Sequence, residues 1–285
     1  MLGELPTCAC CLFPGLALFA LLALGAARGL RRLVPPSWTL ARRGSALLYY
    51  GVAAFVGALA LVIGALSAHA ELRDLAFARL CERMSATASP ELKAAKCAAV
   101  ATAQGRVLEL GPGPGANFDC LRNVSAITHW TGIEPNLHFE RSLAALALPF
   151  PTELRWLAGE ELDVEAGSYD TAISTHVLCS VDDVRAVLRQ VGRALRPGGR
   201  LLFFEHVATP TPDAQPLLAA SQALSGPLLH VIGNGCTYRR LWEDLAALET
   251  DGDGGWTVEL EHYEERAMPL PPLWPHIRGV ATKRG

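Results

Sequence analysis

Hydrophobic positions along the chain form two long runs near the amino terminus and a series of short apolar stretches farther on. The runs cover residues 12–27 and 45–70, and neither contains Asp, Glu, Lys or Arg. About 20 apolar residues cross the hydrocarbon layer as a helix, so the second run predicts a transmembrane helix. We interpret the shorter first run as a retained, short or re-entrant hydrophobic segment. A cleaved signal peptide is the alternative, although Glu4 and the absence of Lys or Arg before residue 12 argue against it.

The pattern changes after residue 70. Apolar positions recur at helical spacing over residues 71–97, with a break at 85–90, which predicts an amphipathic helical linker over residues 71–100. Short apolar strands then alternate with helical segments, at residues 106–110, 127–134, 153–157, 169–176 and 200–205. This alternation predicts an α/β fold with a mostly parallel, doubly wound sheet covered by helices on both faces. We therefore divide the chain into a membrane anchor (1–70), a linker (71–100) and a soluble domain (101–285).

The first of these strands runs directly into a glycine-rich loop. Gly111, Gly113 and Gly115 follow Glu109 at the strand end, and Asn117 lies where the next helix begins. Glycines let the backbone turn tightly and approach a ligand closely, and free N–H groups at a helix start favour electron-rich groups. The spacing Glu-x-Gly-x-Gly-x-Gly differs from the Gly-x-Gly-x-x-Gly of dinucleotide-binding enzymes. The loop therefore predicts a nucleotide-like ligand of another kind.

A second acid ends the next strand. Glu134 lies 25 residues after Glu109 and is followed by Pro135. Rossmann-like folds place an acid at this strand end, about 20 residues beyond the glycine loop, where it accepts hydrogen bonds from ribose hydroxyls. Glu134 is thus the predicted ribose ligand.

Charge and cysteine usage narrow the possible functions. The net charge is −3 and the sequence pI is about 6.2, so the chain lacks the basic footprint of a nucleic-acid-binding protein and we expect no nucleic-acid partner. The five cysteines after residue 80 stand singly, which predicts neither a zinc site nor a dense disulfide framework. We expect ordinary reduced thiols and no bound metal.

Seven blocks in order resemble the methyltransferase-like protein 7 family of class I S-adenosylmethionine-dependent methyltransferases; they are residues 108–118, 134–140, 177–181, 195–199, 204–207, 230–236 and 274–279. The resemblance implies a seven-stranded Rossmann-like sheet and S-adenosylmethionine as cosubstrate. It also implies an enzyme associated with the endoplasmic reticulum or lipid droplets that methylates alkyl thiols.

Site residues carried over from this resemblance meet at the strand ends. Glu109, with the glycine loop and Asn117, is expected to face the methionine part of the cosubstrate. Gly159 and Glu160, after the third strand, are expected at the adenine edge, and His176 lies at the end of the fourth strand.

The acceptor side of the site is predicted from histidines at strand ends. A thiol must ionise to act as a nucleophile, and a nearby base or cation favours ionisation. His206, directly after the fifth strand, is the first catalytic candidate, and His176 is the second. Further residues expected to line an acceptor pocket are His230, Asn234, Cys236 and His276. The apolar stretch 216–229 is expected to form a lid or helix toward the membrane, which suits a small lipophilic substrate.

Membrane orientation is the point at which the sequence signals conflict. Five arginines between the two runs favour a cytosolic position for that connection; they are Arg28, Arg31, Arg32, Arg42 and Arg43. If both runs cross, residue 71 onward lies on the opposite face. Because the cosubstrate is mainly cytosolic, we expect the catalytic domain to face the cytosol, with a hairpin-like or interfacial arrangement or a single true span.

Three functions remain open from the sequence. The first is methylation of a small lipophilic thiol, and the second is methylation of a lipid, quinone or other hydroxyl by the same fold. The third is a membrane-tethered protein that binds S-adenosylmethionine without turnover.

Overall fold

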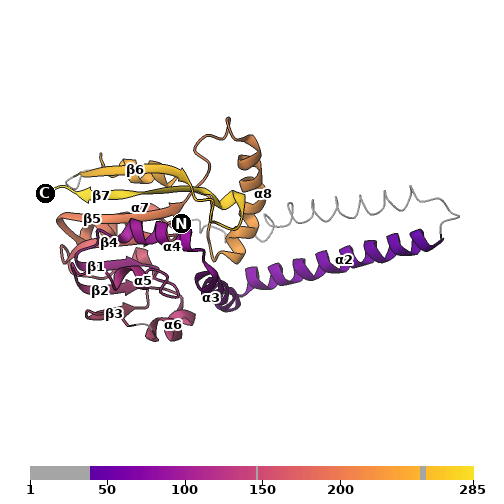
Figure 1. Ribbon diagram of the computed structural model, residues 1–285, viewed down its shortest axis with the longest axis horizontal. Coiled ribbons are helices and arrows are strands. Elements are labelled where there is room, and N and C mark those ends of the chain that lie inside the picture. The colour runs from indigo at the N-terminus through magenta and orange to yellow at the C-terminus, as the bar shows by residue number, and fades with distance from the viewer. Residues whose placement is uncertain (1–38, 146, 251–254) are drawn as a thin grey trace, which may run out of the picture. The chain divides into compact units, whose positions relative to one another are not determined.

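The computed structural model describes residues 39–145, 147–250 and 255–285 (Figure 1). The first hydrophobic run, residues 12–27, lies outside the described residues. The chain divides into two compact units, Met1–Arg73 and Asp74–Gly285. Each is described by itself.

One long helix dominates the described part of the first unit. Helix α2 covers Thr39–Ala68, and its segment Tyr50–Ala68 is long and apolar enough to cross a membrane. Only 12% of that window is buried, and Phe55 and Leu61 are exposed, so this is not the buried core helix of a globular protein. Length and composition thus give weak support to the predicted membrane association.

Residues 71–100, predicted as a linker, form two helices. Helix α3 covers Ala70–Thr87 and α4 covers Pro90–Val100. Ser89 caps α4, because its hydroxyl accepts a hydrogen bond from the backbone N–H of Leu92 at 3.2 Å. Ala78 of α3 and Val100 of α4 are buried in one core cluster of the second unit. This region therefore contributes to the core of the unit that carries the sheet.

The second unit contains a seven-stranded sheet in the order β3-β2-β1-β4-β5-β7-β6, which Figure 1 shows as a stack from β6 to β3. Pairs among β1 to β5 are parallel, whereas β7 pairs antiparallel with β5 and β6. The predicted doubly wound, mostly parallel sheet is confirmed. The strands are β1 (Gly105–Leu110), β2 (Ile127–Ile133), β3 (Thr152–Arg155), β4 (Tyr169–Thr175), β5 (Leu195–His206), β6 (Trp256–Glu264) and β7 (Pro275–Lys283).

Helices cover both faces of the sheet. Side chains alternate along a strand, so Leu108 and Leu110 of β1 pack in one core cluster with α7, while Val107 packs in the other with α4 and α5. Each such buried aliphatic side chain stabilises the fold by roughly 1.5–3 kcal/mol relative to an exposed one. The remaining α-helices are α5 (Phe118–Leu121), α6 (Glu140–Ala144), α7 (Val184–Ala194), α8 (Pro216–Ile232) and α9 (Leu241–Ala247), and the short 3-10 turns are η2 (Leu137–Phe139), η3 (Gly159–Glu161) and η4 (Pro271–Leu273).

A disulfide joins two of these helices. Cys97 of α4 and Cys120 of α5 are bonded, and they are 23 positions apart in sequence. The expectation of reduced thiols is wrong for this pair. Their spacing gave no signal, because the fold and not the local sequence brings the two sulfurs together. Cys81, Cys179 and Cys236 are free thiols.

Candidate active site

The predicted site residues lie at the carboxyl ends of the parallel strands, where the chain crosses from β1 and β2 on one side to β4 and β5 on the other. Ligands bind at this switch point in open α/β sheets, because neighbouring loops diverge there and leave a crevice. The loop after β1 and the ends of β2, β4 and β5 therefore converge on one region.

The glycine loop has the backbone conformation that its sequence predicts. Gly111, Gly113 and Gly115 have φ angles of +51°, +55° and +84°, a region that L side chains rarely adopt. A Cβ on Gly111 would come within 2.8 Å of Val177, whereas one on Gly113 would meet nothing nearer than Phe139 at 3.9 Å. Gly113 is thus required by backbone conformation, and Gly111 also by close packing.

Glu134 joins this loop to the end of β2. Its Oε2 accepts a hydrogen bond from Gly113 N at 3.0 Å, and its Oε1 accepts one from Asn136 N at 2.9 Å. Burial raises the pKa of Glu134 to about 7, although both backbone hydrogen bonds act in the opposite direction. Each carboxylate oxygen keeps a lone pair, so Glu134 can still accept from a ribose hydroxyl. Pro135, which follows, is exposed.

Glu109 forms a second buried acceptor group with Asn117. Its Oε1 accepts from Asn117 Nδ2 at 2.8 Å and its Oε2 accepts from Trp130 Nε1 at 2.7 Å. Asn117 is 1% exposed, and its Oδ1 has no hydrogen-bond partner among the described residues. A buried carbonyl oxygen without a donor is costly, so this atom fits a ligand that brings one. The ammonium of a methionine moiety is such a donor, and S-adenosylmethionine therefore fits the residues present.

Lys96 of α4 is a titratable group that sequence reasoning missed. Burial lowers the pKa of its ammonium, while interaction with Cys81, Glu109 and Glu205 raises it. The same ammonium helps to lower the pKa of His176. Lys96 lies in a segment predicted as a linker, so nothing in its local pattern indicated a place beside the site.

Gly159 and Glu160 are held by contacts within the protein. Glu160 Oε1 accepts from Asp182 N at 2.8 Å and Asp183 N at 3.3 Å, which secures the start of α7. A Cβ on Gly159 would meet Val187 at 3.4 Å, an ordinary contact. These contacts explain both residues without a ligand, and their place at the adenine edge stays a prediction.

Three histidines meet at the ends of β4, β5 and β7. His176 Nε2 lies 2.9 Å from His276 Nε2, and the ring of His206 lies 5.8 Å and 6.2 Å from theirs. Burial lowers the pKa of His176 well below its usual value and lowers that of His276 to about 3, so both rings are neutral. His176 has a φ angle of 60°, which turns the chain sharply after β4. The two predicted catalytic histidines are thus neighbours.

His206 also contacts two buried cysteines. Cys236 Sγ lies 2.9 Å from His206 Nε2 and 3.0 Å from Cys179 Sγ. His206 Nδ1, on the other side of the ring, is buried and has no hydrogen-bond partner among the described residues. His230 makes a different contact, because its Nδ1 lies 3.2 Å from the carbonyl oxygen of Gly235. Cys179 lies in the family block 177–181, but sequence reasoning assigned it no role.

Glu205 ties the β4 and β5 ends together. Its buried carboxylate accepts from Ser174 Oγ at 2.6 Å and from the backbone N–H groups of Val177 and Leu178. The carboxylate thus fixes the loop that carries His176 and Cys179. Sequence reasoning placed Glu205 in a family block but assigned it no role.

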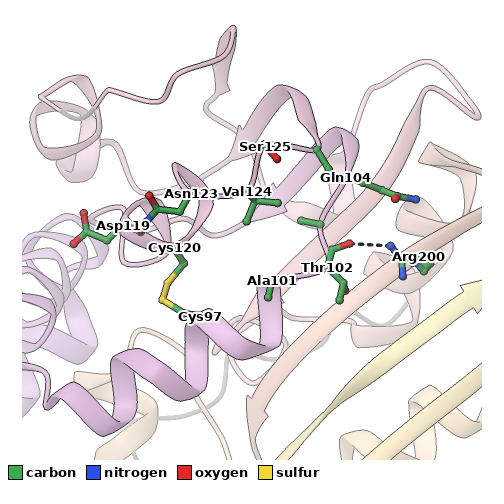
Figure 2. Close-up of a pocket in the computed structure, with 12 residues that line it drawn as sticks. Cys97, Ala101, Thr102, Gln104, Asp119, Cys120, Asn123, Val124, Ser125 and Arg200 are labelled. Atoms are coloured by element: carbon green, nitrogen blue, oxygen red, sulfur yellow. Dashed lines mark hydrogen bonds between the residues drawn. A yellow bond between two sulfur atoms is a disulfide. The ribbon is translucent and has the colours of Figure 1, made fainter.

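A cavity of about 610 Å³ lies at the opposite edge of the sheet (Figure 2). Its lining includes Gln104 and Ser125, which directly precede β1 and β2, together with Asp119 of α5 and Arg200 of β5. Figure 2 shows the Cys97–Cys120 disulfide in the cavity wall and a hydrogen bond from the Arg200 guanidinium to the carbonyl oxygen of Thr102. None of the predicted site residues lines this cavity, so it is not the candidate active site.

Comparison with known proteins agrees with this geometry. A family model described as a methyltransferase domain matches residues 70–256. The chain is 34% identical over 194 residues to human thiol S-methyltransferase TMT1B, covering 64% of this chain and 72% of that protein. It is 34% identical over 190 residues to human thiol S-methyltransferase TMT1A, covering 62% and 70%. It is also 29% identical over 125 residues to phosphatidylethanolamine N-methyltransferase of Cereibacter sphaeroides, covering 42% and 59%.

Solved structures confirm the fold. A possible histamine N-methyltransferase from Thermotoga maritima superposes with a TM-score of 0.53 at 16% identity, covering 76% of this chain and all of that one. The sequence matches show membership, and the sheet order agrees with it. The chain therefore belongs to the family of the thiol S-methyltransferases within the S-adenosylmethionine-dependent methyltransferases, and S-adenosylmethionine is its cosubstrate.

Proposed function

We propose that this enzyme transfers a methyl group to the sulfur of a small lipophilic thiol. The observation that carries the proposal is the buried group of His206 at the end of β5, Cys179 after β4 and Cys236 from the loop between α8 and α9, with the ring of His206 5.8 Å from that of His176. The thiol S-methyltransferase relatives support the choice of a sulfur acceptor.

Cosubstrate binding is assigned to the loop after β1 and the end of β2. Glu109 and Asn117 are proposed to accept the ammonium of the methionine part, and Glu134 to accept the ribose hydroxyls. When bound, S-adenosylmethionine supplies an electrophilic methyl group on a sulfonium. The glycine loop lets its backbone approach the ligand, and the surrounding buried side chains exclude water. Pro135, Gly159 and Glu160 are proposed to complete the nucleoside contacts.

His206 and His176 are the proposed catalytic residues. Methyl transfer is an in-line displacement, so the protein must hold the acceptor sulfur at one side of the methyl group and favour its ionised form. His206 ends β5 and His176 follows β4, so both lie where an acceptor must enter to meet a ligand held at β1 and β2.

A lipid acceptor is the second candidate. The bacterial phosphatidylethanolamine N-methyltransferase relative favours it, and so does the apolar helix α8, on which Leu217 is 87% exposed and Leu224 is 67% exposed. An exposed apolar helix suits contact with a lipid surface or a lipophilic substrate. A non-catalytic binding protein remains the alternative of another class.

One series of measurements separates these functions. Binding of S-adenosylmethionine is measured by calorimetry on the full chain in detergent, and product formation is then followed by mass spectrometry with alkyl thiols, phenols, quinols and phospholipids. We expect methyl thioethers from the thiols. Methylated oxygen or lipid products alone would favour the second candidate, and binding without any product would favour the third.

The membrane association is proposed to place the enzyme on the endoplasmic reticulum or on lipid droplets, with the catalytic domain in the cytosol. The availability of the cosubstrate supports the cytosolic side. The Cys97–Cys120 disulfide argues for the opposite side, because disulfides persist in oxidising compartments. Protease treatment of intact microsomes tests the orientation. Digestion of residues 74–285 is expected, and complete protection would overturn it.

A further inference from the structure

Three soft ligand atoms meet at the carboxyl edge of the sheet. Cys179 lies in the loop after β4, His206 is the last residue of β5, and Cys236 lies in the loop between α8 and α9. Cys179 Sγ, Cys236 Sγ and a ring nitrogen of His206 all lie within 4.8 Å of one another. The three residues are only 1%, 5% and 5% exposed. Three segments that are distant in sequence thus bring two thiols and an imidazole together in one buried cluster.

We propose that Cys179, Cys236 and His206 bind a Zn²⁺ ion whose fourth coordination position takes the sulfur of the methyl acceptor. The first half of this inference is independent of the activity. The second half rests on the proposed thiol S-methyltransferase function.

The donor set suits zinc. Thiolate and imidazole are preferred ligands of Zn²⁺, and catalytic zinc sites use three protein ligands, two Cys and one His in one known class, with the fourth position left for water or substrate. The three-residue set here matches that arrangement. A structural zinc site would need a fourth protein ligand, and no further His, Cys, Asp or Glu of the described residues belongs to this group.

The separations allow an ion with small side-chain movements. Zinc bonds of about 2.3 Å to sulfur and about 2.0–2.1 Å to nitrogen give tetrahedral edges of roughly 3.6–3.8 Å between ligand atoms. The present separations are 2.9 Å from Cys236 Sγ to His206 Nε2 and 3.0 Å from Cys236 Sγ to Cys179 Sγ. Each of these two pairs must therefore open by less than about 1 Å, and the atoms of the third pair, Cys179 Sγ and the His206 nitrogen, lie within 4.8 Å of each other.

The other nitrogen of His206 agrees with a ligand beside the cluster. A metal on Nε2 fixes the ring proton on Nδ1, and a ligating histidine normally donates that proton to an acceptor. His206 Nδ1 is buried and has no partner among the described residues. A bound acceptor or an ordered water would supply the missing partner.

The ion would perform the step that a thiol acceptor requires. The thiol sulfur would bind zinc and lose its proton to solvent water, because a thiol that coordinates zinc is deprotonated. The thiolate would then form the new bond to the methyl carbon as the bond from that carbon to the sulfonium breaks, so that S-adenosylhomocysteine leaves and a methyl thioether is formed. Two thiolates and a neutral imidazole make the site neutral with Zn²⁺, and the incoming thiolate makes it negative. No oxidation or reduction occurs.

Zinc content gives the first test. The full chain is purified in detergent in a background in which Cys8, Cys10 and Cys11 are Ser, because clustered thiols near the amino terminus would bind zinc on their own. After stripping and reloading with zinc, we expect one ion per chain by elemental mass spectrometry. Cys179→Ser and Cys236→Ser are each expected to lose it, whereas Cys81→Ser, a free thiol outside the cluster, keeps it.

Cobalt spectroscopy gives a second readout that needs no variant. Co²⁺ in the same site is expected to show the sulfur-to-cobalt charge-transfer band of a tetrahedral thiolate complex. Addition of an alkyl thiol without any methyl donor should strengthen this band, while the alcohol of the same carbon skeleton should not.

The outcomes are distinct. Absence of bound zinc, or peptide mapping that shows Cys179 and Cys236 bonded to each other in the purified protein, would overturn the site. Bound zinc with a cobalt spectrum that ignores thiols would overturn the acceptor role. Bound zinc with a thiol response supports the site even if no methyl thioether forms, and that result would instead contradict the proposed function.

Discussion

Glu134 and Gly113 are joined by a hydrogen bond of 3.0 Å that links the end of β2 to the glycine loop after β1. The carboxylate accepts this N–H with one oxygen and that of Asn136 with the other. A glutamine at this position has only one acceptor oxygen, so Glu134→Gln leaves one backbone N–H facing an amide nitrogen. Because charge-assisted hydrogen bonds contribute about 1.5–3 kcal/mol, we expect S-adenosylmethionine affinity to fall by roughly ten- to a hundredfold.

Calorimetric titration of the Glu134→Gln protein measures this effect. Glu165→Gln, on an exposed loop before β4, is the control and should bind like the wild type. Equal affinities for Glu134→Gln and the control would remove Glu134 from the binding site.

The raised pKa of Glu134 predicts a pH dependence of cosubstrate binding. Burial holds this pKa at about 7, above the usual 4.5, so the carboxylate takes up a proton as the pH falls through 7 and loses acceptor capacity. Affinity for S-adenosylmethionine should therefore be constant above about pH 8 and decline below pH 7.

The same raised pKa makes the contribution of Glu134 to stability largest below its unfolded pKa, and this contribution is lost as the pH rises through 7.

Calorimetry between pH 5.5 and 8.5 tests the binding profile, with Glu134→Gln as the variant that should lose this inflection. An inflection that persists in the variant would assign it to another group.

Sequence patterns predicted the parallel strands of the sheet, because each strand and the loop after it are specified by residues that are consecutive in the chain. Strand, glycine loop and helix follow one another around Gly111, and each acid at a strand end, such as Glu109 or Glu134, is placed by the strand that precedes it. The strands β6 and β7 were not predicted from alternation. Trp256–Glu264 mixes exposed and half-buried positions, and its pairing with β7 is antiparallel.

Contacts between distant segments could not be predicted in the same way. Cys97 and Cys120 meet only because α4 packs beside α5, and Cys179 meets Cys236 across 57 positions. Lys96 likewise interacts electrostatically with Glu109 and Glu205 from a helix whose own pattern shows only a packing face. These groups depend on the tertiary fold, and spacing rules for single segments do not detect them.

Asn117 offers a test of the methionine end of the site. Its Oδ1 is the buried acceptor without a partner, and its Nδ2 holds Glu109 at 2.8 Å. We expect Asn117→Ala to weaken S-adenosylmethionine binding by roughly tenfold or more, the cost of one hydrogen bond to a charged group. Binding of 5′-methylthioadenosine, which lacks the amino-acid part, should be unchanged. A matching loss for both ligands would show that Asn117 acts on the loop and not on the ammonium.

The disulfide predicts a redox-dependent stability. Cross-linking Cys97 to Cys120 restricts a loop of 23 positions in the unfolded chain, which corresponds to roughly 3 kcal/mol. Cys97→Ser with Cys120→Ser should lower the free energy of unfolding by about this amount in urea. Reductant should destabilise the wild type equally and leave the double variant unaffected. A reductant effect that persists in the double variant would identify a different sensitive bond.

His206 is expected to affect turnover more than cosubstrate affinity. Its side chain lies at the end of β5 with Cys236 on one side and a buried, unpartnered Nδ1 on the other, whereas the hydrogen bonds that position Glu109 and Glu134 do not involve it. His206→Ala should therefore lower kcat for a thiol by roughly a hundredfold or more, a typical loss for a group that moves a proton or stabilises charge in the reaction. The Kd for S-adenosylmethionine should stay within about threefold of the wild type.

His262→Ala, on the exposed surface of β6 against the ring of Trp242, is the matched control for histidine loss. If both variants turn over equally, His206 has no part in the chemistry, and if the His206 variant loses cosubstrate binding instead, its role is to shape the pocket.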